Sequence, residues 1–87
     1  MYLLANELPK SVLFTYSLKI GFKIPEYETE QKNKLFRSKV KLNGKIYSTG
    51  YWEKNKKFAE QGAALAAMLA LGLVTRESLI NSGSLIQ

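Results

Sequence analysis

The first amphipathic pattern in the chain predicts a helix from Leu8 to Gly21. Four apolar residues in this stretch fall on one helical stripe, which should face the core: Val12, Leu13, Tyr16 and Ile20. Pro9 suits the first turn, because an N–H at that position would have no partner inside the helix. Gly21 favours the left-handed backbone conformation that ends many helices.

A second helix is predicted from about Asn55 to Leu71, and its core face is built mainly from alanine. Asn55 can act as the N-cap, and Gly72 can close the other end. The residues of the predicted core face are spaced four apart: Ala59, Ala63, Ala67 and Leu71. Alanine has the best helix propensity, and its small side chain lets a helix lie close to the sheet that it covers.

Between the two helices, polar and apolar residues alternate with a period of two, which predicts strands. In the first strand, Tyr27 and Thr29 alternate with glutamates. In the second, the alternation puts four residues on the core face: Phe36, Ser38, Val40 and Leu42. The dipeptide Asn43-Gly44 predicts a tight hairpin turn, because both positions favour positive φ. Residues 45–49 should then return as the third strand, with Ile46 pointing inward.

The order of these elements predicts an α+β fold, α-β-β-β-α, with a three-stranded antiparallel sheet and both helices packed on one face. The other face should carry charges that can pair across strands: Glu26, Glu28, Glu30, Arg37, Lys39 and Lys41. We expect residues 1–87 to form one domain with a core at about residues 8–72. In the C-terminal tail, residues 75–80 are predicted to add one short helical turn, and residues 81–87 are predicted to be frayed.

The positive charge is concentrated in one part of the chain. Residues 31–57 contain nine basic residues and one acid, a net charge of +8, within a chain whose total is +6. This concentration indicates a polyanionic partner. Lys54, Lys56 and Lys57 lie at the start of the second helix, where free backbone N–H groups favour anions, so they predict a phosphate site. The alternative is an ordinary solvated lysine cluster.

The composition argues against catalysis by this chain alone. It has no His and no Cys, so the commonest general base and the thiol nucleophile are missing, and its seven acids form no evident metal-ligand or paired-carboxylate pattern. We therefore expect no catalytic residues, no metal site and no disulfide. No apolar run is long enough to span a membrane, and the first residues lack the features of a signal peptide. An intracellular location, cytoplasmic or nuclear, is expected.

The chain resembles the double-stranded RNA-binding domain family over roughly Leu8 to Leu71. The resemblance is carried by the opening Leu8-Pro9-Lys10-Ser11-Val12-Leu13 with Tyr16, by Pro25-Glu26-Tyr27, by Phe36 and Val40, and by Gly50 with the block Lys56-Lys57-Phe58-Ala59, Ala63-Ala64 and Ala67. The family recognises A-form RNA by shape, across two minor grooves and the major-groove phosphates between them.

The resemblance also implies contact residues. Lys56 and Lys57, helped by Lys54, would straddle the major-groove phosphates. Lys10 and Ser11 of the first helix would meet one minor groove. The loop between the first two strands, at Gln31 to Lys34, would approach the other minor groove with these cations: Lys32 and Lys34.

Three departures from the family pattern point to weaker or altered binding of long perfect duplexes. A polar pair that often faces the minor groove is replaced by Phe14 and Thr15. The first loop has no Gly-Pro-x-His motif. The third basic residue of the lysine block is Glu60.

One subgroup of the family is more similar than the rest. Residues 47–49 (Tyr-Ser-Thr) and 52–61 (Trp-Glu-Lys-Asn-Lys-Lys-Phe-Ala-Glu-Gln) resemble the domain appended to animal-type tRNA dihydrouridine synthases. The resemblance implies that the chain is a fragment of such an enzyme and recruits tRNA, with residues 2–10 extending the contact. FMN and NADPH would belong to the attached synthase domain, and this domain would hold no cofactor.

A second hypothesis is a protein-binding or homodimerisation module with weak RNA binding. It is motivated by the missing minor-groove residues and by apolar residues of the tail: Leu79, Ile80, Leu85 and Ile86. The aromatic residues near the lysines, Tyr51 and Trp52, are expected to pack within their loop instead of stacking on a base. Phe14 is expected to cover the core or a neighbouring segment.

Overall fold

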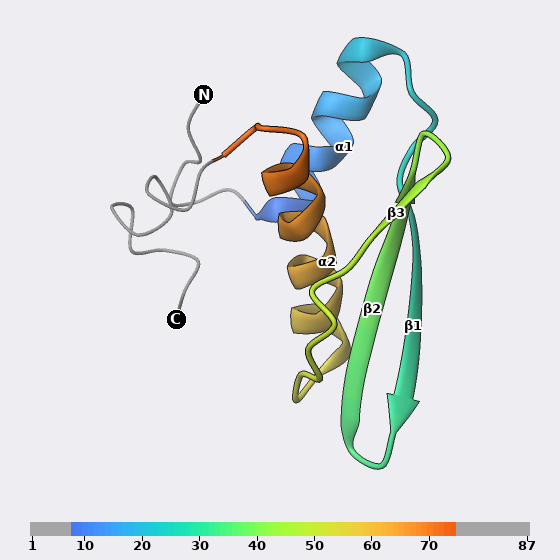
Figure 1. Cartoon of the computed structure of the whole chain (residues 1–87), viewed down its shortest axis with the longest axis vertical. Helices are drawn as coiled ribbons and strands as arrows, with labels where there is room; N and C mark the ends of the chain where they lie inside the picture. Colours follow the sequence, from blue (N-terminus) through green and yellow to red (C-terminus); the bar gives the residue numbers. More distant parts are fainter. Residues whose placement is uncertain (1–7, 75–87) are drawn as a thin grey trace.

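The computed structural model describes residues 8–74, which form two helices and a three-stranded sheet in the predicted order (Figure 1). The elements are α1 (Pro9–Ile20), β1 (Glu26–Lys32), β2 (Leu35–Leu42), β3 (Lys45–Tyr47) and α2 (Lys56–Ala70). The expectations for residues 75–80 and 81–87, including the apolar residues of the tail, lie outside the described residues. Neither helix of residues 8–74 is long and apolar enough to cross a membrane.

The sheet is antiparallel, with strand order β1-β2-β3. β1 pairs with β2 along its full length, from Glu26 opposite Lys41 to Lys32 opposite Leu35. The predicted hairpin between β2 and β3 is confirmed, since Asn43 and Gly44 have φ values of 53° and 81°. The link between β1 and β2 is shorter than the predicted loop at 31–34: Gln31 and Lys32 belong to β1, and Asn33, with φ 58°, turns the chain.

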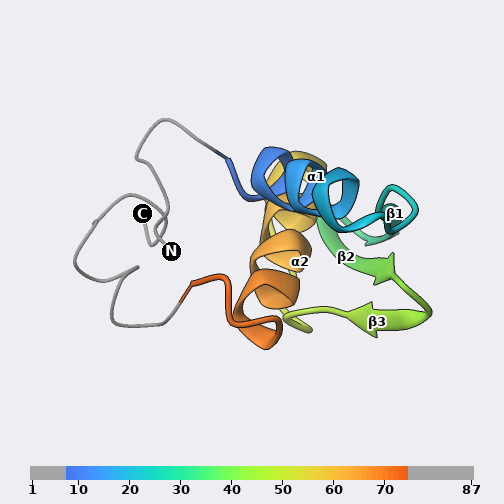
Figure 2. The ribbon, with the colours of Figure 1, turned by 90° about the horizontal axis from the view of Figure 1, so that it is seen from above.

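Both helices lie on the same side of the sheet (Figure 2), which confirms the predicted fold. α2 packs on β2, and α1 packs mainly against α2. The alanine face predicted for α2 is buried, with Ala59, Ala63 and Ala67 at most 4% exposed. The largest fully buried side chains around it are Leu13, Leu42, Met68, Val40 and Ser17. A small-residue helix face therefore lies between α1 and the sheet.

Two predicted core residues are on the surface. Ile46 is 61% exposed because it pairs with Lys41 and shares the outer face of the sheet, whereas Tyr47 pairs with the buried Val40. β3 is also shorter than predicted. Ile20 is 44% exposed, and the buried position of the last α1 turns is Ser17, whose hydroxyl donates to the Leu13 carbonyl oxygen at 2.8 Å.

The outer face of the sheet is lined by paired charges, as the alternation predicts. Arg37 contacts Glu30 at 2.6 Å, and Lys39 contacts Glu28 at 3.2 Å, each pair joining residues that face one another on β1 and β2. These acids offset part of the positive charge of β2. The cations outside the sheet are consequently the main source of the domain's positive field.

Candidate nucleic-acid interface

The start of α2 presents three lysines on a capped helix terminus. Asn55 has extended backbone angles, and its side-chain oxygen accepts the Phe58 backbone N–H at 2.8 Å, so it is the N-cap as predicted. Lys54, Lys56 and Lys57 are exposed, and the first turn contains no acid. Among residues 8–74 no carboxylate pairs with any of the three. Unpaired ammonium groups and the positive end of the helix dipole thus coincide, an arrangement that favours phosphate.

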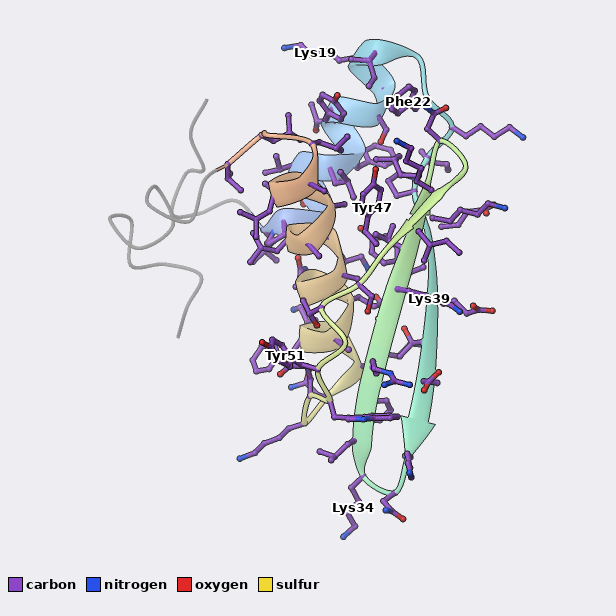
Figure 3. All side chains as sticks on the ribbon, viewed as in Figure 1. Lys19, Phe22, Lys34, Lys39, Tyr47 and Tyr51 are labelled. Carbon is purple, nitrogen blue, oxygen red and sulfur yellow. The ribbon has the colours of Figure 1, made fainter. Side chains whose placement is uncertain are left out.

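The segment that leads into α2 is fixed to the sheet beside the β1–β2 turn. Phe36 and Glu53 exchange two backbone hydrogen bonds, of 2.8 and 2.7 Å. Lys54 directly follows Glu53, and Lys34 lies two residues before Phe36, in the β1–β2 turn. Figure 3 shows Lys34 at the tip of the β1–β2 hairpin. The cations of the hairpin and those of α2 are therefore held at the same end of the domain.

In this segment the Trp52 side chain packs against the sheet, whereas the Tyr51 side chain is exposed. The guanidinium carbon of Arg37 lies 4.4 Å from the centre of the Trp52 ring, and Arg37 also contacts Glu30. The prediction that Trp52 packs within the loop region is confirmed. The same prediction for Tyr51 is wrong, because its side chain is 71% exposed.

Lys10 is held by acidic and aromatic partners that lie far away in sequence. Its ammonium nitrogen is 2.6 Å from Glu60 Oε1 and 4.8 Å from the centre of the Tyr27 ring. Its backbone N–H donates to Gln61 Oε1 at 2.9 Å, which satisfies one free donor at the uncapped start of α1. Glu60, which stands where the family has a third basic residue, thus offsets the charge of Lys10.

Tyr27 is the one residue near this pair with a clearly shifted pKa. Burial, and secondarily the negative charge of Glu60, raise the pKa of Tyr27 to about 12. Its hydroxyl oxygen is buried and has no hydrogen-bond partner among the described residues. Both effects disfavour the phenolate, so Tyr27 is a neutral structural residue at physiological pH.

The residues predicted to contact the two minor grooves are exposed, and they lie on two different elements, α1 and the β1–β2 hairpin. Ser11 and Phe14 lie on the surface of α1, and the Phe14 side chain is 45% exposed. Phe14 therefore does not cover the core, and the alternative expectation, contact with a neighbouring segment, stays a prediction. Lys32 and Lys34 are exposed at the far end of the hairpin. The structure brings Lys34 and the α2 lysines to one end of the domain, while Lys10 is already engaged with Glu60.

Two features of this surface could not be read from residue types alone. The Lys10–Glu60 pair joins positions 50 residues apart, and no local pattern predicts which lysine a glutamate will meet. The exposure of Tyr51 and Phe58 is the other feature. The exposure of Phe58 could have been predicted, because Phe58 follows Lys57 in the first turn of α2 and lies outside the predicted core face.

The fold and the sequence together identify the family. A sequence profile of the double-stranded RNA binding motif matches residues 9–71, which is most of the chain and nearly all of its described part. The chain belongs to the double-stranded RNA-binding domain family. The α-β-β-β-α order, with a three-stranded antiparallel sheet, is consistent with the fold of this family.

Several solved structures are similar to this one. The domain of human tRNA-dihydrouridine(20) synthase, in a variant with two lysines replaced by alanine, is 32% identical with a TM-score of 0.75, over 82% of this chain and 77% of that one. Another crystal structure of a tRNA-dihydrouridine(20) synthase domain is 33% identical with a TM-score of 0.76, over 88% and 81%. Arabidopsis HYL1 is 36% identical with a TM-score of 0.72, over 76% and 99%.

Proposed function

We propose that this double-stranded RNA-binding domain binds structured RNA through the lysines of α2 and recruits tRNA to an attached dihydrouridine synthase domain. The observation that carries the proposal is the capped α2 terminus with Lys54, Lys56 and Lys57 exposed and unpaired within the described residues. Lys56 and Lys57 would straddle the major-groove phosphates, and Lys54 would support them.

The similarity to the domains of tRNA-dihydrouridine(20) synthases supports the finer part of the proposal. Under this proposal the domain binds the RNA and takes no part in catalysis. FMN and NADPH would bind only to the attached synthase domain. Ser11 at one minor groove, and Lys32 and Lys34 at the other, complete the proposed contact surface. Lys10 would contribute less than a free lysine, because Glu60 holds its ammonium group.

The central test replaces Lys56 and Lys57 by alanine together and titrates a duplex RNA of ~16 base pairs, the span of one such domain. We expect binding to be nearly lost, and the salt dependence of any residual binding to fall by ~0.9 in log–log slope for each lost phosphate contact. A matched control removes two cations elsewhere, with Lys19→Ala and Lys23→Ala. Lys19 lies at the end of the molecule opposite Lys34 (Figure 3), so the control should bind nearly normally.

RNA class is tested by titrating tRNA, duplex RNA, duplex DNA of the same sequence and single-stranded RNA. Stronger binding of duplex RNA than of duplex DNA is expected, because recognition depends on A-form shape and 2′-hydroxyls. A further preference for tRNA supports the synthase assignment. Equal binding of all four at low salt, lost together at higher salt, would reduce the proposal to nonspecific attraction.

A second candidate function, protein binding or homodimerisation, is favoured by the outer surface of α1. Phe14 and Leu18, one helical turn apart, are 45% and 59% exposed. Light scattering over a wide concentration range tests the homodimer. A dimer that dissociates when both residues are replaced by serine would support it, and a monomer at all concentrations would exclude it.

A further inference from the structure

Two exposed aromatic rings lie beside the lysines of α2. Tyr51 is 71% exposed and Phe58 is 60% exposed. Trp52, between Tyr51 and the lysines in sequence, is partly buried, and the Arg37 guanidinium stacks on its ring. Domains that hold a duplex only by phosphates and 2′-hydroxyls have no use for exposed aromatic faces, because paired bases are already stacked on one another.

The rings are carried by segments that meet on one side of α2. Phe58 follows Lys57 in the first helical turn, and its side chain leans toward the helix N-terminus as all helical side chains do. Gly62 lies one turn further along the same face. A Cβ atom at Gly62 would be 3.7 Å from the methyl carbon of Thr49, so the segment before α2 crosses the helix there.

Tyr51 is held close to this crossing. Its backbone N–H donates to the Thr49 hydroxyl at 3.1 Å, so the chain turns directly after it has packed on α2. Figure 3 shows the Tyr51 side chain beside the N-terminal half of α2. Tyr51 and Phe58 therefore belong to two segments that meet near the start of α2, where the free lysines lie.

We propose that Tyr51 and Phe58 form a stacking platform for a base extruded from the RNA duplex. This inference rests on the proposed function, since the lysines must first hold the phosphates. Aromatic side chains beside a cationic groove are the general means of binding unpaired bases, because every base has a π-face. The ligand is thus a duplex with an unpaired nucleotide at the major groove that Lys56 and Lys57 straddle. A bulge or a helix junction of a folded RNA provides such a nucleotide.

The position of the unpaired nucleotide follows from the binding mode. One domain spans ~16 base pairs, with the major-groove phosphates in the middle of the span. A duplex of about that length fixes the register of the protein. An extruded base at the centre of the duplex can then reach the rings, and one near an end cannot.

The test therefore uses three RNAs: a perfect duplex of ~16 base pairs, the same duplex with a central single-nucleotide bulge, and the same duplex with the bulge near one end. The bulged base is 2-aminopurine, whose fluorescence reports stacking. We expect the central bulge to bind roughly tenfold more tightly than the perfect duplex, the scale of one base stacked on an aromatic ring. Its fluorescence should be quenched on binding. The end bulge should show neither effect.

Tyr51→Ala and Phe58→Ala should each remove most of the preference for the central bulge while leaving the affinity for the perfect duplex within about twofold, because the lysines remain. Tyr51→Phe keeps the ring and should behave like the natural protein. Ile46→Ala removes an exposed apolar side chain from the outer face of the sheet and serves as the matched control. Thermal unfolding of each variant checks that the fold is retained.

The outcomes separate this inference from the proposed function. Equal binding of all three RNAs by the natural protein, without quenching, overturns the platform and leaves duplex binding intact. No binding of the perfect duplex overturns the proposed function. If the alanine variants weaken perfect and bulged duplexes equally, the rings do not read an extruded base. If they change only the mass of the free protein in light scattering, the rings form a protein interface, and the platform is again excluded.

Discussion

Arg37 lies between Trp52 and Glu30, with its guanidinium carbon 4.4 Å from the centre of the indole ring and its terminal nitrogen 2.6 Å from the carboxylate. This contact links the outer face of the sheet to the segment that carries Lys54. The lysine-bearing segment is therefore held by a side-chain clamp as well as by the Phe36–Glu53 backbone bridge.

Removing the clamp should weaken RNA binding without removing a cation. Trp52→Ala loses a cation–π contact of about 0.5–1 kcal/mol at a site of this exposure. We expect a similar loss in the free energy of unfolding and a severalfold weaker duplex affinity, because Lys54 is less well positioned. Arg37→Lys keeps the charge but loses the planar stack, so it should show the same direction of change. Unchanged affinity in both variants, measured by titration of a perfect duplex, would contradict a positioning role.

Asn55 allows stability and RNA binding to be separated. Asn55→Ala loses the N-cap and should lower the free energy of unfolding by about 1 kcal/mol. Asn55→Asp keeps the cap and adds a negative charge at the positive end of the helix dipole, so stability should be equal or higher. Its duplex affinity should nevertheless fall, because the carboxylate lies among Lys54, Lys56 and Lys57.

Denaturant unfolding and RNA titration of the two Asn55 variants provide the measurement. If Asn55→Asp binds RNA as well as the natural protein, the α2 terminus is not in contact with phosphates. Asn55→Ser, which caps without a charge, is the control for both quantities.

Glu60→Gln should release the ammonium group of Lys10. The ion pair is only partly buried, so its loss should cost at most about 1 kcal/mol of stability. The amide oxygen of glutamine can still accept the Thr29 hydroxyl, which lies 3.3 Å from the present carboxylate. Removal of one negative charge beside the lysines should strengthen duplex binding and increase its dependence on salt.

Glu28→Gln is the matched control for the Glu60 variant, because it removes the same charge from an ion pair on the outer face of the sheet. Its effect on duplex affinity should be smaller. Equal gains for both variants would mean that only the total charge matters and that Lys10 has no particular place in the interface.

Tyr27 should make the domain sensitive to alkaline pH. The folded protein holds the Tyr27 proton more tightly than the unfolded chain, with a pKa of about 12 against 10.0. The contribution of this group to stability is therefore complete below pH 10 and is lost as the pH rises through about 12. Tyr27→Phe removes this dependence and leaves every other ionisable group of the chain in place.

Below pH 9, Tyr27→Phe should be at least as stable as the natural protein, because the hydroxyl that it removes is buried without a hydrogen-bond partner among residues 8–74. Denaturant unfolding at several pH values from neutral to alkaline measures both effects. A constant difference between the two proteins across the alkaline range would show that the Tyr27 pKa is not raised by folding.

The fold could be predicted from the sequence because its signals are local and agree with one another. The alternation from Phe36 to Leu42 sets the faces of β2, Asn43-Gly44 sets the hairpin, and Asn55 sets the start of α2. Ile46 could not be placed in the same way. A three-residue strand carries too little alternation to fix its faces, and only the pairing of Tyr47 with Val40 decides them.

The sequence predicts where the lysines of the candidate site lie along the chain, but it does not predict which side chains they contact. The position of Lys56 and Lys57 at a helix start follows from residues next to them in the chain. The engagement of Lys10 with Glu60 depends on how α1 lies against α2, which no local pattern encodes. Whether the seven predicted contact residues touch RNA stays a prediction.

The alanine face of α2 gives the domain an asymmetric tolerance to mutation. Ala59, Ala63 and Ala67 are buried but have only a methyl side chain, so replacing them by glycine removes little buried volume. Any larger residue must push α2 away from the sheet or from α1, at a cost of typically 1–3 kcal/mol. Sequence drift at Ala59, Ala63 and Ala67 is therefore restricted to small residues, whereas the exposed positions on the outer side of the helix are free to diversify.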